Sequence, residues 1–220
     1  MAARADANHG LGQDWSFGPR RYITFPMFGD GIFTQEGEAW RRSRLMLRPQ
    51  LVHRQYEDLK LFDEPMDDLM DNLPESGGVV DLQPLFFRFT LDVTTAFLFG
   101  ESIRSLKSEP GSPEQHFAAA FDLAQSYVIQ RFRLLDLYWL IGGREFREAC
   151  RQVNAFADKV IDQNLRGDAL SNDDGKETGR YVFLRTVAKS FPDRSALRGQ
   201  IINILAAGRD TTACLLSWTL

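Results

Sequence analysis

The stretch Ile204-Leu-Ala-Ala-Gly-Arg-Asp-Thr-Thr-Ala-Cys214 lies inside a proline-free segment that follows Pro192 and continues to the last residue. Asp193 or Ser195 can cap a helix at the start of this segment, because either side chain can accept a hydrogen bond from a free backbone N–H. The segment predicts one helix of about 28 residues, roughly 40 Å long at 1.5 Å per residue. Such a helix is long for a globular protein and indicates a mainly α-helical fold that ends in it.

Upstream of this helix, apolar residues recur at helical spacing in several segments. Residues 84–99 are the most apolar of these, and Gly100 is placed to act as their C-cap. We expect Pro49 to close an earlier helix and Pro65 to kink or split another. Residues 1–33, rich in glycine, aromatic residues and turn formers, are expected to be irregular. The pattern predicts one unit of about eight helices, with helical segments near 36–47, 55–73, 84–99, 114–131, 144–167 and 180–189 and connections at 107–113, 134–143 and 168–179.

The quoted stretch also carries residues suited to chemistry. Its small residues 206–208 remove bulk from one helix face, so that a flat or large group can approach the backbone. Thr211 and Thr212 can each bond the carbonyl four residues back, which beside a glycine favours a local bulge or a bound water. Asp210 and Thr211 then place a carboxylate and an alcohol side by side, as a proton-delivery site needs. The alternative is a helix crossing, in which the small residues allow close packing and the polar pair faces water.

The composition excludes some classes of partner. The formal net charge is −4, whereas a nucleic-acid-binding protein presents a concentrated basic surface. The first residues are polar and no apolar run follows them, so we expect neither a signal peptide nor an N-terminal anchor in this chain. No later segment is apolar for long enough to predict a membrane span.

Cysteine and histidine residues show no metal-binding pattern. Cys150 and Cys214 are too few and too far apart for a zinc site or a disulfide framework. His9, His53 and His116 stand separately, without the spacing of metal ligands. We therefore assign no metal ligand and expect both cysteines to be small buried side chains.

A second motif, Trp40-Arg-Arg-Ser-Arg44, stands in the first predicted helix. Positions four residues apart share a helix face, so the indole of Trp40 and the guanidinium of Arg44 should point the same way. A guanidinium offers the planar pair of donors that a carboxylate accepts. The alternative is that the arginines of this segment form a solvated basic surface.

The stretch Ala207-Gly-Arg-Asp-Thr-Thr212 resembles the central-helix signature of the cytochromes P-450, which are haem-thiolate monooxygenases. The resemblance implies that Ala207 and Gly208 border the haem and its oxygen pocket and that Asp210 and Thr211 relay protons to dioxygen. The Trp-x-x-x-Arg motif resembles the family's haem-propionate contact, which implies that Trp40 and Arg44 bind the cofactor. The fold implied is the front and central part of the cytochrome P-450 fold.

Two further segments resemble fungal members that hydroxylate alkanes and fatty acids: Phe28-Gly-Asp-Gly-Ile-Phe-Thr-Gln-Glu-Gly-Glu-Ala-Trp40 and Phe89-Thr-Leu-Asp-Val-Thr-Thr-Ala-Phe-Leu-Phe-Gly-Glu101. The implied reaction is hydroxylation of an apolar small molecule by haem, O2 and electrons from a flavoprotein reductase. Candidates for lining the substrate pocket are residues 25–33, residues 117–132, Ile204 and Ala207, although such residues more often form plain core.

Family members are more than twice this long, and the chain lacks their Glu-x-x-Arg pair and their Phe-x-x-Gly-x-x-x-Cys-x-Gly loop, whose cysteine binds the iron. We therefore interpret residues 1–220 as a partial catalytic domain without the N-terminal anchor and the C-terminal haem-cysteine region, and expect the isolated chain to be inactive. The resemblance implies the endoplasmic reticulum membrane for a complete member. Apolar faces of residues 84–99 and 195–220 should be exposed in the isolated chain. The alternative is a non-catalytic α-helical remnant that acts, if at all, through contacts with other proteins.

Overall fold

The computed structural model describes residues 16–52, 59–75, 77–171 and 183–220. Within these ranges the chain forms eight α-helices, two short 3-10 segments and no strand, which confirms the expected mainly α-helical fold. In chain order the elements are α2 (Pro19–Phe28), α3 (Gly37–Val52), η2 (Leu59–Phe62), α4 (Asp63–Asp71), α5 (Leu82–Phe99), α6 (Pro113–Leu134), η3 (Leu135–Leu140), α7 (Gly143–Ser171), α8 (Phe183–Ala188) and α9 (Arg194–Thr219).

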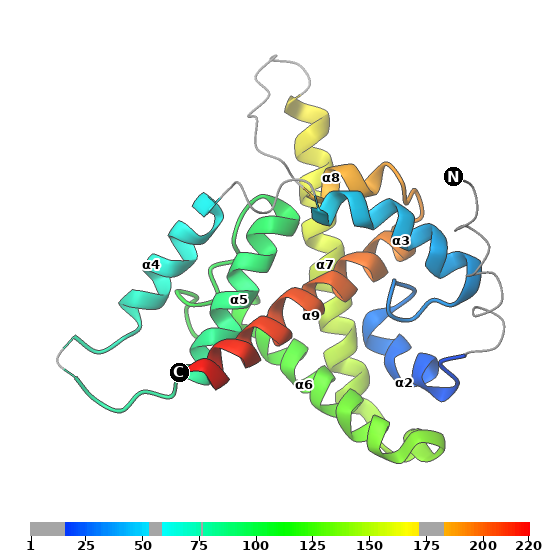
Figure 1. Ribbon diagram of the computed structural model, residues 1–220, viewed down its shortest axis with the longest axis horizontal. Coiled ribbons are helices and arrows are strands. Elements are labelled where there is room, and N and C mark those ends of the chain that lie inside the picture. The colour runs from blue at the N-terminus through cyan, green and yellow to red at the C-terminus, as the bar shows by residue number, and fades with distance from the viewer. Residues whose placement is uncertain (1–15, 53–58, 76, 172–182) are drawn as a thin grey trace, which may run out of the picture.

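The long helix expected at the end of the chain is α9, which runs diagonally through the middle of the molecule (Figure 1). The carboxylate of Asp193 accepts a hydrogen bond from the Ala196 N–H at 2.8 Å, so the expected N-cap is confirmed. Most of the first half of α9 is buried, including Leu197, Ile201 and Ile202. A helix that is apolar on most of its faces needs neighbours on several sides, and α2, α5, α7 and α8 all pack against α9.

Helix α5 lies along α9 and supplies much of the core (Figure 1). Gly100 ends it in the left-handed conformation at φ 83°, as expected of a C-cap glycine. Leu91 and Leu98 are fully buried, so the expectation of an exposed apolar face over residues 84–99 is wrong, because α9 covers that face. The exposed apolar side chains of the α9 segment are instead at its end: Leu215, Trp218 and Leu220.

Two expectations near the amino end are corrected. Residues 19–28 form α2 rather than irregular chain; Pro19 occupies the first turn, where no N–H is needed, and Ile23 and Met27 are fully buried. Helix α3 does not close at Pro49 but continues to Val52. The hydrogen bond that the proline removes there is offset by packing of Leu47 against the main core.

The remaining boundaries differ by a few residues. Pro65 falls in the first turn of α4, where a proline is tolerated, and the 3-10 segment η2 precedes that helix. Helix α6 begins at Pro113 because the Ser112 hydroxyl caps it by accepting the Gln115 N–H at 3.2 Å. Helix α7 reaches Ser171, four residues into the expected connection at 168–179, and the rest of that connection lies outside the described residues. Among the helices described here, none is long and apolar enough to span a membrane.

Candidate functional site

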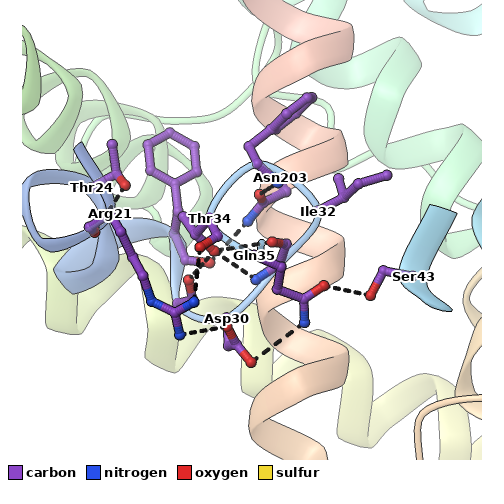
Figure 2. A network of polar contacts seen from close by, with 12 residues as sticks. Arg21, Thr24, Asp30, Ile32, Thr34, Gln35, Ser43 and Asn203 are labelled. Atoms are coloured by element: carbon purple, nitrogen blue, oxygen red, sulfur yellow. Dashed lines mark hydrogen bonds and ion pairs between the residues drawn. The ribbon is translucent and has the colours of Figure 1, made fainter. Parts of the chain in front are cut away.

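The loop of residues 29–35 is docked onto α9 by hydrogen bonds that its backbone N–H groups donate to two buried amide side chains (Figure 2). The Oε1 atom of Gln200 accepts the Ile32 N–H at 3.0 Å, and the Oδ1 atom of Asn203 accepts the Phe33 N–H at 2.8 Å. The Asn203 amide nitrogen in turn donates to the Phe28 carbonyl at 3.0 Å. The loop backbone is therefore bonded to α9, just N-terminal to the residues expected to carry chemistry.

Two glycines allow this close approach. A Cβ atom added to Gly31 would lie 2.3 Å from the side-chain nitrogen of Asn203, and one added to Gly199 would lie 2.5 Å from the carbonyl oxygen of Asp30. Both distances are too short for real atoms, so any larger residue would separate the loop from the helix. Neither position requires an unusual backbone, so the glycines are needed for space alone.

A buried chain of hydrogen bonds continues from α9 to α3. The Gln200 side-chain nitrogen donates to the Ser43 hydroxyl at 2.8 Å, and that hydroxyl donates to the Gln35 side-chain oxygen at 2.5 Å. All three side chains are buried, and a satisfied polar network of this kind fixes the geometry of the groups it joins. The 29–35 loop, α3 and α9 are thus held in one arrangement, and Arg44 is the neighbour of Ser43 in that arrangement.

Trp40 and Arg44 lie together on an exposed face of α3. The guanidinium carbon of Arg44 is 5.5 Å from the centroid of the Trp40 ring, which confirms that the two side chains point the same way. Among the described residues, no carboxylate lies within ion-pair distance of Arg44, whereas the nearby Arg41 pairs with Glu38 at 3.5 Å. The Arg44 guanidinium is therefore available to an anionic group from outside this part of the chain. Its contact with a haem propionate stays a prediction.

On α9, the Thr211 hydroxyl donates to the Ala207 carbonyl at 2.8 Å, as expected. The matching bond from Thr212 to Gly208 is not formed, and α9 continues as a regular α-helix through this region, so the expected bulge is wrong. Thr211 and Thr212 are both exposed, while Ala207, Gly208 and Asp210 are half-buried.

Gly208 meets α5 rather than open space. A Cβ atom added to it would lie 2.8 Å from the hydroxyl oxygen of Thr94. The close crossing of α5 and α9 therefore accounts for the glycine, which was the alternative interpretation of the small residues. That Ala207 and Gly208 border a haem stays a prediction.

Arg209 is a functional candidate that the sequence analysis missed. It is 2% exposed, and its guanidinium carbon lies 4.8 Å from the Phe87 ring centroid and 5.2 Å from that of Phe121. One terminal nitrogen is paired with the carboxylate of Asp122 and the other with Asp210 at 3.1 Å. A signal was present in the sequence, because Arg209 falls at helical spacing with the small and apolar residues Ile202, Ala206 and Ala213, all of which are buried.

Both oxygens of the Asp210 carboxylate are held. Oδ1 accepts from Arg209, and Oδ2 accepts from the side-chain nitrogen of Gln125 on α6. Burial raises the pKa of Asp210, and the nearby Asp122 charge acts in the same direction, while the Gln125 hydrogen bond and Arg209 lower it. Asp210, with a partly buried carboxylate, and Thr211, with an exposed hydroxyl, are thus consecutive residues of α9.

The two cysteines differ in their surroundings. Cys150 is buried, as expected, and burial raises the pKa of its thiol to about 12. Cys214 is exposed, so the expectation that it is buried is wrong; its position on α9 faces away from the core that holds Ala213. No group of three histidine, cysteine or acidic side chains in the described ranges could hold a metal ion. His9 and His53 lie outside those ranges.

The residues expected to line a substrate pocket divide into two groups. Phe117, Phe121 and Ile204 are buried in the core, and the Phe117 ring stacks on Phe156 with their centroids 4.2 Å apart. Phe25 and Phe33 are about half exposed. A cavity of about 310 Å³ lies elsewhere, between the end of α5 and α7, and none of these candidate residues lines it.

Comparison with known proteins gives one family and several fungal relatives. The family model for "Cytochrome P450" matches residues 11–220. A protein named cytochrome P450 from Arthroderma benhamiae is 46% identical over 196 residues, which cover 87% of this chain and 39% of the relative. Cytochrome P450 52A5 of Candida maltosa and cytochrome P450 52A1 of Candida tropicalis are each 40% identical over 215 residues, covering 93% of this chain and 40% and 39% of the relatives. The chain thus spans about 40% of the length of the curated relatives it matches.

Proposed function

Because the chain belongs to the cytochrome P450 family, we propose that it is part of a haem-dependent monooxygenase. This enzyme would hydroxylate an apolar small molecule with O2 and electrons from a flavoprotein reductase. The observation that carries this proposal is the placing of Asp210 and Thr211 on α9, within the part of the chain that matches the family. Haem iron, when bound, would supply the activation of dioxygen. The chain's own residues would hold the cofactor and move protons.

Trp40 and Arg44 are proposed to hold the haem through a propionate. Arg44 is exposed and without an acidic partner among the described residues, and a planar guanidinium stacked on an indole can offer parallel N–H donors to a carboxylate. Ala207 and Gly208 are the proposed wall of the cofactor site on α9. The support for this site is the exposed Arg44 guanidinium beside Trp40 and the half-buried backbone at Ala207 and Gly208.

Protons are proposed to enter from the α6 surface and reach Thr211. The Asp210 side chain is 29% exposed, so its carboxylate can take a proton directly from solvent beside α6, while the Arg209 guanidinium between it and Asp122 stays protonated. The Thr211 hydroxyl donates to the Ala207 carbonyl, so its oxygen keeps acceptor sites for a water that carries a proton. In this path Asp210 gains a proton at the carboxylate and passes it by water to Thr211 Oγ1.

The finer assignments rest on resemblance. The segment of residues 28–40 is similar to fungal members that hydroxylate alkanes and fatty acids, so a long-chain fatty acid or alkane is the proposed substrate class. The endoplasmic reticulum membrane is the proposed location of the protein that contains this chain, and residues 1–220 are proposed to be part of its catalytic domain.

A Thr211→Ala substitution tests the proton path in the holoenzyme that contains this chain. With lauric acid as substrate, it should lower hydroxylated product per O2 consumed by at least about tenfold, because the hydroxyl is lost while oxygen binding is not. Thr212→Ala is the matched control, since Thr212 is also exposed and its side chain forms no hydrogen bond with the described residues. Full coupling in Thr211→Ala, or equal loss in both variants, would contradict the proposed role.

Haem binding is tested separately by thermal unfolding with and without haem. Haem should raise the unfolding temperature, and Arg44→Ala should reduce that rise, because the propionate loses a partner. Arg42→Ala, an exposed arginine of the same helix, is the control. A protein that unfolds at the same temperature with and without haem would favour the alternative, a non-catalytic helical remnant.

A further inference from the structure

We propose that Arg209, together with Asp122 and Gln125 of α6, positions the Asp210 carboxylate, so that α6 sets the orientation of the group that carries protons. The purpose of this positioning rests on the function proposed above. We call these four side chains the Arg209 network. Arg209, Asp122 and Gln125 are positioning residues, because they act through Asp210.

The network leaves the carboxylate little freedom to rotate. The Gln125 amide makes two contacts: its nitrogen donates to Asp210 Oδ2 and its oxygen accepts from Arg209 at 3.4 Å. The same Arg209 nitrogen donates to Asp210 Oδ1 at 3.1 Å. Arg209, Gln125 and Asp210 therefore form a closed ring of hydrogen bonds, in which one member comes from α6 and two from α9.

Arg209 itself is fixed by aromatic rings. Phe87 of α5 and Phe121 of α6 lie 4.8 and 5.2 Å from its guanidinium carbon, and the side chain is 2% exposed. These contacts hold the guanidinium plane in place while its two ends reach Asp122 and Asp210. The pairing with Asp122 ties the arginine to α6 a second time.

The contribution of Arg209 to the stability of the fold does not explain why an arginine occupies this buried position. Its Nε–H is buried without a hydrogen-bond partner, and an unsatisfied buried donor costs about 1 to 3 kcal/mol. Its ion pairs with the 59% exposed Asp122 and the 29% exposed Asp210 are weakened by water and offset little of this cost. The orientation that Arg209 imposes on Asp210 is a function that an apolar side chain would not provide.

The charged groups that act on Asp210 are Arg209 on its own helix and Asp122 on α6, while α5 contributes only the non-titrating side chains of Phe87 and Thr94 at this crossing. The Gln125 hydrogen bond lowers the Asp210 pKa and the Asp122 charge raises it. Replacing Gln125 or Asp122 one at a time should therefore move the pKa of the Asp210 carboxyl in opposite directions. A role in packing alone predicts no such difference in sign.

The test is the titration of the Asp210 carboxyl, followed by NMR of isotope-labelled aspartate in the holoenzyme and assigned with Asp210→Asn. Gln125→Met should raise the midpoint, because Asp210 loses the amide hydrogen bond that lowers its pKa. Asp122→Asn should lower it by less, because Asp122 is 59% exposed and its charge is screened. Asp122→Asn keeps a side-chain oxygen that can accept from Arg209, so the substitution removes the charge with little change of shape. Midpoints that stay unchanged, or that move in the same direction, would overturn the proposal.

Arg131→Lys is the matched control. Arg131 is also a buried arginine between two rings, 4.9 Å from the Tyr138 centroid and 4.7 Å from that of Phe146, but no carboxylate of the described residues pairs with it. The substitution removes a comparable guanidinium and should leave the Asp210 midpoint unchanged. A midpoint that moves as far in Arg131→Lys as in Gln125→Met would show a general effect of destabilisation and overturn the proposal.

Coupling of O2 consumption to product separates this inference from the proposed function. If Gln125→Met and Asp122→Asn move the midpoint in opposite directions while Thr211→Ala leaves coupling unchanged, the network positions Asp210 but the proposed proton path is wrong. If Thr211→Ala uncouples the enzyme while both midpoints stay unchanged, the proton path stands and the Arg209 network is refuted.

Discussion

Replacing the buried Asp92 with asparagine should change how the stability of the protein depends on pH. Asp92 lies on α5 and is 0% exposed. One of its oxygens accepts the Ser105 N–H at 2.7 Å and the other accepts the Leu106 N–H at 3.1 Å. Burial raises the pKa of this carboxyl from 3.8 to about 6, against the lowering effect of the hydrogen bonds from Ser105 and Leu106.

The rise in the Asp92 pKa sets the size and sign of the effect. Between pH 3.8 and about 6 the folded protein keeps a proton on Asp92 that the unfolded chain releases. The contribution of this group to the free energy of unfolding is therefore fully present below pH 3.8 and is lost as the pH rises through 6. At 1.36 kcal/mol per pH unit, the loss amounts to about 3 kcal/mol.

Urea unfolding of the wild-type protein and Asp92→Asn measures this loss. Because asparagine does not titrate, the wild-type stability minus that of the variant should fall by about 3 kcal/mol from about pH 4 to about pH 7. A difference that stays constant, or grows with pH, would refute the reasoning. Asp68→Asn is a control of opposite sign: the hydrogen bond from Arg104 lowers the Asp68 pKa, so the wild-type advantage there should be lost as the pH falls.

Two further predictions concern packing and reactivity. Gly31→Ala should lower the free energy of unfolding by about 3 kcal/mol in thermal unfolding, because the new Cβ displaces the Asn203 amide from the loop. The loss should be smaller in an Asn203→Ala background. Losses that simply add in the double variant would contradict the contact between residues 31 and 203. A thiol reagent should modify Cys214 in the native protein and spare the buried Cys150 until unfolding, as followed by mass spectrometry of labelled peptides. Equal rates for the two thiols would show that Cys150 is accessible.

Features that depend on a few neighbouring residues could be predicted from the sequence. The Asp193 cap needs only the N–H three residues ahead, and the Gly100 cap needs only a residue that tolerates a positive φ. The Thr211 bond to the Ala207 carbonyl spans one helical turn. The shared face of Trp40 and Arg44 follows from the same spacing. In each case the structure that decides the outcome lies within four residues of the side chain.

Features that depend on distant parts of the chain were missed. Helix α2 has little helical pattern of its own and forms where Ile23 and Met27 are buried against other helices. Arg209 lies inside the motif that contains Asp210 and Thr211, and its local spacing indicates burial but not that the rings of Phe87 and Phe121 enclose its guanidinium. Asp92 stands in the most apolar predicted helix without any local sign of a role, because its partners Ser105 and Leu106 lie thirteen and fourteen residues further along the chain.

The docking of the 29–35 loop onto α9 also constrains the order of events at the ribosome. The hydrogen bonds from Ile32 to Gln200 and from Phe33 to Asn203 join residues separated by 168 and 170 positions. At about 5 to 20 residues per second, the loop is translated roughly 10 to 30 s before its acceptors exist. During that time the Ile32 and Phe33 N–H groups lack the partners that they have in the folded protein. The docking of this loop can therefore be completed only after residues 200–203 of α9 have been translated.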